Sequence, residues 1–321
     1  MSVARQGVLL GVAAYLIWGL SALYWPLVEP TGAVEILALR VLWSPVAVGI
    51  LVLALGRRRQ VAAIVRRPRD LALLSLAGVL TSVNWALFIW ATMNGHVVDA
   101  SLGYFITPLV SVMLGVALLG ERLRAGQWAA IGLGAVAVAV LTVAYGGFPW
   151  IALTLAATFG AYGLIKKRVG AGAVEGLMVE TAVLFPFAAV YTVVIQASGQ
   201  ATFGHVSVAN TLLGIGSGFV MMAPMLLFSA ATTRIPLSLV GMLQFIEPVV
   251  QFLVGVLVFG EVMPAARWAA FALLWVSLAV LTAEGLRRRR SPASAARPAP
   301  RRSSRSSRTV SSAVRDPEAR P

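Results

Sequence analysis

The chain has 321 residues, of which 59% are hydrophobic and 12% charged. Soluble globular domains are about 45–50% apolar and roughly 25% charged, so this composition excludes a soluble protein and predicts an integral membrane protein. Cysteine is absent, which excludes a disulfide framework, a thiol nucleophile and a thiolate metal site.

The formal net charge of +14 is concentrated at one end of the chain. Residues 287–321 contain eleven arginines against Asp316 and Glu318, a net charge of +9, which leaves +5 for the preceding 286 residues. A basic tail beside a membrane is explained by helix orientation and by anionic lipid headgroups. Nucleic acid is therefore not expected as a partner.

A helix that spans a bilayer needs about 20 mostly apolar residues. The sequence predicts an all-α membrane protein with ten such helices, at residues 7–25, 35–55, 71–92, 98–119, 127–145, 148–165, 177–196, 210–231, 237–259 and 267–285.

The charges of the connections predict the orientation of these helices. Alternate connections are basic, among them Arg57–Arg69 and Lys166–Arg168, and the excess of Lys and Arg marks the cytoplasmic side. We therefore expect a multi-pass protein of the cell membrane with both termini in the cytoplasm. After Ser291 the chain is rich in Pro, Ser and Arg, and a tail of this composition is expected to be disordered.

The chain contains an internal repeat with an offset of 140 residues. The segment Ser101–Thr142 recurs as Gly241–Thr282 without a gap, and 18 of the 42 positions are identical. A unit of five spans is odd, so the second copy must enter the membrane inverted. Inverted repeats of this kind are typical of secondary transporters, which bind substrate near the midplane. We expect five-helix units at 1–146 and 147–286, followed by the tail at 287–321.

Several segments resemble one known family. AYLIWG (14–19), NWALFIWATMNGHVVDASLGYFITPL (84–109) and LSLVGMLQFIEP (237–248) are similar to the RarD proteins, EamA-type members of the drug/metabolite transporter superfamily. The resemblance covers about residues 5–285 and implies a ten-span permease of the inner membrane. Members carry the label of chloramphenicol-sensitivity proteins, and no substrate transfers from them. One departure is Thr107-Pro108, where many relatives carry Asn-Pro.

Charged residues inside spans are costly and need a reason. Three are predicted here: Arg40, Glu180 and Glu247. Arg40 and Glu180 are repeat equivalents of opposite charge, so they could form a buried ion pair if their helices face one another. Alternatively, Arg40 binds an anionic or polar group of the substrate, and Glu180 releases it or exchanges a proton.

Two polar stripes lie at helical spacing in otherwise apolar spans. Tyr104, Thr107 and Ser111 form the first, and Gln244, Glu247 and Gln251 form the second. The stripes could line a wet cavity, or they could be hydrogen bonds between helices, worth about 0.6 kcal/mol each. Glu247 directly precedes Pro248 and is the candidate proton site.

Two further candidates differ between the halves of the chain: Asn84 and Trp85, where Pro224 and Met225 stand in the second half. The indole of Trp85 could stack on an aromatic substrate. The predicted substrate and transport residues are Arg40, Asn84, Trp85, Tyr104, Glu180, Gln244, Glu247 and Gln251. Repeated carboxylates report the fold instead: Glu35 and Glu175 begin helices, where the helix dipole favours them, and Glu121 and Glu261 lie at span junctions.

A transporter of small polar molecules accounts best for these features. No Walker motif is present, so any energy coupling must come from an ion or substrate gradient, with proton coupling one option. We expect neither an enzyme, a metal nor a cofactor, although His96 has Asp99 as a close acidic neighbour. The alternatives are an intramembrane lipid-processing enzyme and a lipid-binding scaffold; the scaffold would not explain the inverted duplication. The sequence does not determine the oligomeric state.

Overall fold

The computed structural model describes residues 2–119, 125–145, 148–220, 222–232, 234–235 and 243–290. Glu121 and the tail beyond Arg290 lie outside these residues. The described chain is helical and contains no strand. Its helices are α1 (Val3–Leu20), α2 (Ala33–Ala54), α3 (Arg58–Val65), α4 (Pro68–Met93), α5 (Val97–Leu119), α6 (Ala125–Tyr145), α7 (Trp150–Val169), α8 (Ala173–Ala197), α9 (Val208–Val220), α10 (Met222–Thr232), α12 (Ile246–Leu253) and α13 (Ala265–Arg290), with short helices η1 (Ser21–Leu23), η2 (Trp25–Val28) and η3 (Val254–Val258).

Seven helical stretches of the described chain are long and apolar enough to cross a membrane. Three shorter apolar stretches, Trp150–Lys166, Ile246–Val258 and Ala265–Val280, fall on the remaining predicted spans. Large apolar side chains such as Val190 and Leu257 are exposed on the outside of the bundle, as lipid contact requires. The all-α membrane class is confirmed.

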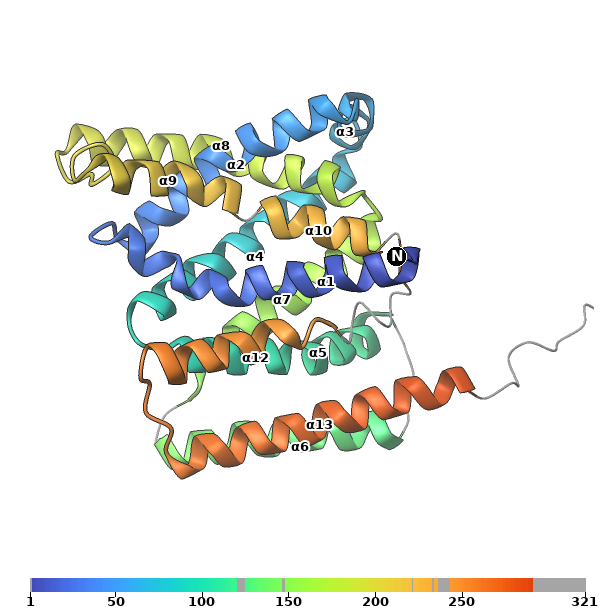
Figure 1. Ribbon diagram of the computed structural model, residues 1–321. Coiled ribbons are helices and arrows are strands. Elements are labelled where there is room, and N and C mark those ends of the chain that lie inside the picture. The colour runs from blue at the N-terminus through green and yellow to red at the C-terminus, as the bar shows by residue number, and fades with distance from the viewer. Residues whose placement is uncertain are drawn as a thin grey trace, which may run out of the picture.

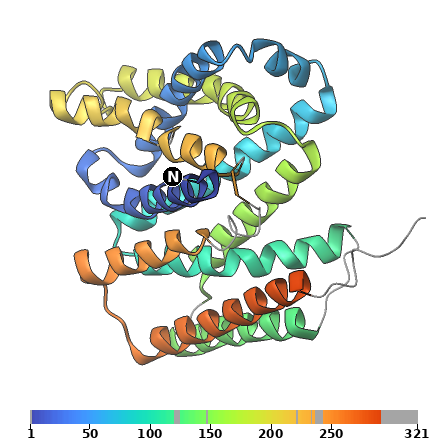
Figure 2. The same cartoon turned by 45° about the vertical axis from the view of Figure 1, so that its right-hand side comes forward.

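The helices lie in layers (Figure 1). α6 and α13 pack against each other along one edge, and α5 and α12 form the next layer. α2, α8 and α9 lie together at the opposite edge, while α4 and α7 cross obliquely through the middle. Figure 2, turned by 45°, shows the α6–α13 pair as a separate layer below the rest. The N-terminus and the end of α13 lie at the same end of the molecule.

Helices that the 140-residue offset relates make matching contacts. α5 packs on α7, and its counterpart α12 packs on α1. Likewise α4 packs on α7 as α10 packs on α1, and α2 packs on α9 as α8 packs on α4. The pattern of helix pairs is therefore nearly unchanged when the two halves of the chain are exchanged.

Glycines allow two of these crossings. A Cβ added at Gly103 would lie 2.7 Å from the carbonyl oxygen of Ala152, and one at Gly218 would lie 2.8 Å from the carbonyl carbon of Trp43. Both distances are too short for any side chain, and the obstacle is backbone. Small residues that let helix backbones approach are the usual basis of packing inside membranes, and here they join α5 to α7 and α9 to α2.

The repeated carboxylates connect elements as well as beginning helices. Glu35 accepts hydrogen bonds from the backbone N–H groups of Thr202 and Phe203, both at 3.0 Å, and so ties α2 to the connection between α8 and α9. Glu175 forms an ion pair with Arg57 at 2.6 Å. The segment after Arg57, which its arginines predict to be a connection between spans, is the amphipathic helix α3. Its eight residues are too short to stand out from the surrounding arginines.

Candidate functional site

Arg40 is the largest charged side chain in the core. It lies on α2 with 1% of its surface exposed. Its guanidinium carbon is 3.4 Å from the centre of the Trp85 ring on α4 and 5.6 Å from that of Trp25. Among the described residues no carboxylate pairs with it, and its Nε has no hydrogen-bond partner. Aromatic faces therefore stabilise this cation, and its guanidinium keeps an N–H donor that no described residue accepts.

Glu180 is engaged elsewhere, so the predicted ion pair between Arg40 and Glu180 is wrong. The Glu180 carboxylate accepts a hydrogen bond from Lys166 Nζ on α7 at 2.7 Å and one from the Tyr162 hydroxyl at 3.4 Å. In the sequence, Lys166 belongs to a basic run that predicts a cytoplasmic connection, whereas in the structure it lies within α7. The available signal was the i, i+4 spacing of Tyr162 and Lys166, which puts both on one face of α7.

The antiparallel arrangement of α2 and α8 explains why the pair does not form. Arg40 and Glu180 each lie seven residues after the first residue of their helix, and these helices begin at opposite ends of the molecule. The distance between the two residues can be estimated along α4, which contacts both. A Cβ on Gly78 would lie 3.1 Å from the carbonyl oxygen of Glu180, and the ring of Trp85, seven residues further along α4, stacks on the guanidinium of Arg40. At about 1.5 Å per residue, the two levels are roughly 10 Å apart.

Asn84 is the centre of a buried hydrogen-bond network. Its amide nitrogen donates to the Leu155 carbonyl at 3.0 Å and to the Thr158 hydroxyl at 2.9 Å, both on α7. Its oxygen accepts from the Tyr104 hydroxyl at 2.9 Å. The network joins α4, α5 and α7 directly beside Trp85, and it matches the interhelical interpretation of the Tyr104 stripe.

The other members of the first stripe do not join the network. The Thr107 hydroxyl donates to the Gly103 carbonyl within its own helix at 3.0 Å, and Ser111 is exposed. Ser101, which is not among the predicted site residues, donates to the Pro248 carbonyl at 2.7 Å and connects α5 to α12. In the sequence, Ser101 could have been recognised as a candidate because it places a hydroxyl within an apolar span.

The second stripe leads along α12. Gln251 is buried and donates to the Glu247 carboxyl at 3.4 Å, and its own side-chain oxygen has no partner among the described residues. Glu247 interacts electrostatically with Tyr15 and Tyr104, and Tyr104 also interacts electrostatically with Arg40. Gln244 is partly buried in the turn before α12. Tyr104 thus interacts electrostatically with both Arg40 and Glu247.

Aromatic rings cover the α1 side of Glu247. Tyr15 and Trp18 lie 5.5 Å apart between ring centres, and each contacts Phe228 of α10. Gly19 makes room for α12, because a Cβ there would lie 3.0 Å from the Glu247 carbonyl oxygen. Arg40, Trp85, Asn84, Tyr104, Glu247 and Gln251 therefore belong to one region between α1, α2, α4, α5 and α12, and Glu180 lies outside it.

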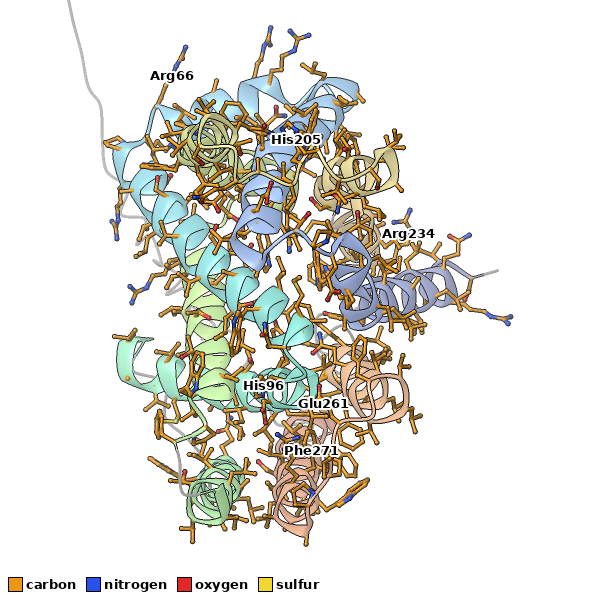
Figure 3. The ribbon with its side chains drawn as sticks, turned by 90° about the vertical axis from the view of Figure 1, so that its left-hand side faces the viewer. Arg66, His96, His205, Arg234, Glu261 and Phe271 are labelled. Carbon is orange, nitrogen blue, oxygen red and sulfur yellow. The ribbon has the colours of Figure 1, made fainter. Side chains whose placement is uncertain are left out.

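A polar cluster links two connections at the end of the molecule opposite the N-terminus. Figure 3 shows His96 and Glu261 close together there. Asp99 bonds to His96 at 3.0 Å and to Arg267 at 3.0 Å, and Glu261 accepts from the N–H groups of Val97 and Val98. Burial raises the pKa of Glu261, while these N–H groups and Arg267 oppose the rise. The cluster joins α5 to the start of α13.

Comparisons with known proteins agree on one family. The profile of the EamA-like transporter family matches residues 5–143. Protein RarD of Streptomyces exfoliatus is 51% identical over 283 residues, 88% of this chain and 90% of that protein. An uncharacterised transporter of Vibrio cholerae is 39% identical over 88% of this chain and 94% of its own. One crystal structure, 22% identical, has a similar fold, with a TM-score of 0.56 over 89% of this chain and 99% of the other. The chain belongs to the RarD family of EamA-type membrane transporters.

Proposed function

We propose that this membrane transporter is a secondary permease that carries small polar metabolites or drugs by alternating access. The observation that carries the proposal is Arg40, a buried cation for which the described chain provides aromatic faces and no carboxylate. Lys166, in contrast, has a carboxylate partner, because it forms an ion pair with Glu180. The lack of a carboxylate is therefore a feature of the Arg40 site and is not shared by every cation inside this fold.

Arg40 is the proposed recognition group for the substrate. A buried charge is expensive unless it is paired and hydrogen-bonded, and a guanidinium has five N–H donors. Trp85 and Trp25 offset part of this cost through cation–π contact. A carboxylate or phosphate of a bound substrate would satisfy the remaining donors, so the expected substrate carries an anionic or strongly accepting group.

The proposed architecture is two inverted five-helix units, residues 1–146 and 147–286, with ten spans. Its support is the 140-residue sequence repeat, the matching contacts of related helices, and the position of both ends of the described chain at one end of the molecule. Transporters of this design bind substrate between the repeats near the midplane. With the basic connections inside, both termini are cytoplasmic, and the tail at 287–321 would contact anionic headgroups.

Glu247 is the proposed proton site. It shares the region with Arg40 and lies within electrostatic range of Tyr104, so its protonation would change the field at the substrate. Transport is expected to depend on pH, and Glu247→Gln should remove that dependence while the protein still folds. A Val249→Ala variant is the control on the same helix, because Val249 is exposed and lies outside the proposed site. A pH profile unchanged in Glu247→Gln would contradict proton coupling through this residue.

The function is tested by ligand binding followed by transport. Purified protein is screened by thermal shift against amino acids, nucleosides and phenicol drugs, each carboxylate beside its neutral amide. Ligand at 100 times its Kd adds about 2.7 kcal/mol of stability. Hits are then assayed for uptake into proteoliposomes with wild type, Arg40→Met and the exposed control Arg59→Gln. Binding or uptake undiminished in Arg40→Met would overturn the assignment of Arg40.

No specific observation among the described residues favours the alternatives, an intramembrane lipid-processing enzyme or a lipid-binding scaffold.

A further inference from the structure

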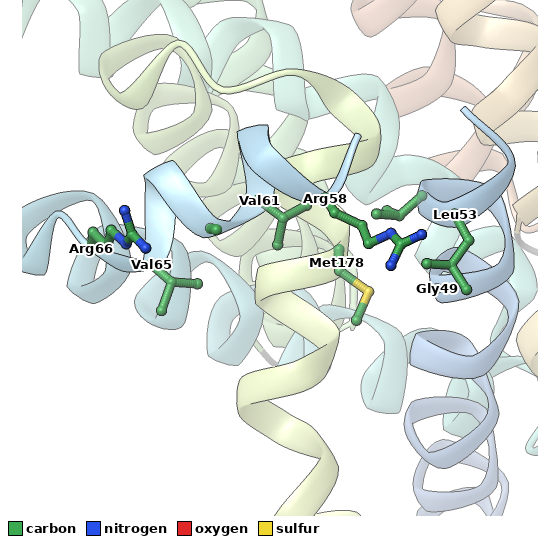
Figure 4. A pocket seen from close by; sticks show the side chains of 9 residues that line it. Gly49, Leu53, Arg58, Val61, Val65, Arg66 and Met178 are labelled. Carbon is green, nitrogen blue, oxygen red and sulfur yellow. The ribbon is translucent and has the colours of Figure 1, made fainter. Parts of the chain in front are cut away.

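A groove lies far from the transport site, between α2, α3 and α8. It has a volume of about 470 Å³ and is lined by apolar side chains that include Leu53, Val61 and Met178, within the roughly 300–1,000 Å³ typical of small-molecule sites. The charged residues that line it are Arg58 and Arg66. In Figure 4 Arg58 extends toward Leu53 and Met178, and Arg66 lies at the far end beside Val65.

The groove leaves apolar surface uncovered at an end of the bundle. Leu53 and Val65 on its walls are 55% and 48% exposed. α3 packs against α8 and α4, with Val61 and Val65 toward the groove and Arg58 and Arg66 along its border. An amphipathic helix with this pattern lies in the interface of a bilayer. With α3 in that position, the open apolar surface would face the acyl region of one leaflet.

The arginines of this segment differ in what they bind. Arg57 forms its ion pair with Glu175, and Arg67 lies 3.7 Å from Asp70. Arg58 and Arg66 have no carboxylate partner within the described chain. These two are also the arginines that border the apolar groove. Guanidinium groups bind phosphate through paired hydrogen bonds, so the groove combines an apolar slot with a phosphate-binding border.

We propose that the groove binds one anionic phospholipid from the leaflet at this end of the molecule. One acyl chain fills the slot beside Met178, Arg58 binds the phosphate at that end of the groove, and Arg66 at the far end adds positive charge that favours an anionic headgroup. The lipid covers surface that is otherwise exposed and lies against both α3 and α8, which the Arg57–Glu175 ion pair already joins. It therefore reinforces a contact between the two halves of the chain.

The headgroup part is tested with purified full-length protein in detergent. Binding of phosphatidylglycerol and phosphatidylcholine is counted by native mass spectrometry. Wild type is expected to bind phosphatidylglycerol more tightly, and the double variant Arg58→Gln/Arg66→Gln should bind it roughly thirtyfold more weakly. Arg59→Gln is the matched control, since Arg59 is exposed on α3 and does not line the groove. Equal weakening by the control, or equal binding of both lipids by wild type, would overturn the proposal.

The acyl-chain part is tested by filling the slot. A Cβ built on Gly49 meets no atom within 4 Å, and leucine is a better helix former than glycine, so Gly49→Leu should fold and occupy the groove. It should weaken phosphatidylglycerol binding at least tenfold with both arginines intact. Inorganic phosphate at the same concentration should not raise the Tm of wild type. Unchanged lipid binding in Gly49→Leu, or equal stabilisation by phosphate, would show that the chain does not enter.

Discussion

Arg40 and Glu180 occupy equivalent positions in the two halves of the chain, yet their surroundings differ. Glu180 has a cation at 2.7 Å and a tyrosine hydroxyl at 3.4 Å, both from α7. Arg40 has two indole rings and an Nε without a partner. One copy of the position forms an ion pair with a neighbouring helix, and the other has an unpartnered donor, which we propose that a substrate uses. Burial of a charge alone does not distinguish these roles, whereas the partner does.

The strongest way to break this comparison is to remove Lys166. Lys166→Met leaves Glu180 buried without its cation, and breaking a buried pair costs about 3–5 kcal/mol. The free energy of unfolding in detergent should fall by that amount, measured by thermal or denaturant unfolding. Lys166→Met with Glu180→Leu should recover most of the loss, since no charge is then stranded. A stable single variant would mean that the Glu180 pair is not structural.

The next largest effect is expected at Arg40, on transport. Arg40→Met should lower uptake into proteoliposomes about 100-fold, equivalent to about 2.7 kcal/mol, through loss of charge-assisted hydrogen bonds to the substrate. Its stability should stay the same or rise, because no carboxylate is left unpaired. The two variants thus have opposite signatures. If Arg40→Met instead lowered the stability of the protein and had no separate effect on uptake, Arg40 would be structural as well.

Trp85 sharpens the comparison, because it supports the cation from one face. Trp85→Leu removes a cation–π contact worth about 2 kcal/mol when desolvated, so substrate affinity should fall roughly thirtyfold. Trp85→Phe keeps an aromatic face and should retain most of the affinity. The measurement is Kd by thermal shift over a range of substrate concentrations. Equal affinity in the leucine and phenylalanine variants would show that stacking does not position Arg40.

The smallest effect is expected at Tyr104. Tyr104→Phe removes the hydrogen bond to Asn84 and leaves the ring contacts with Phe88 and Phe159. Interhelical hydrogen bonds in membranes average about 0.6 kcal/mol, so unfolding should become easier by that amount and uptake should fall a few-fold. Thr158→Ala is the control on the same network. A loss of uptake as large as that of Arg40→Met would make Tyr104 a direct substrate ligand.

Much of the candidate site could be predicted from the sequence, because polar residues are rare within its apolar spans. In spans where nearly every residue is apolar, Arg40, Glu247 and Asn84 stand out, and the structure brings these three residues into one region with Trp85 and Tyr104. Lys166 was missed because it belongs to a run of three basic residues at a helix end, which local sequence describes equally well as a connection. α3 was missed because an eight-residue amphipathic helix lies within the arginine-rich stretch.

The sequence by itself determined that this is an all-helical membrane protein of the RarD family and which few polar residues lie inside its helices. Hydropathy depends on each segment alone, so a run of about 20 apolar residues is readable without its neighbours. Only the tertiary structure decided which charges meet. The antiparallel packing of α2 and α8 places Arg40 and Glu180 roughly 10 Å apart along α4, and α7 supplies Lys166 to one of them. Such pairing depends on the depth and crossing of helices, which no single segment contains.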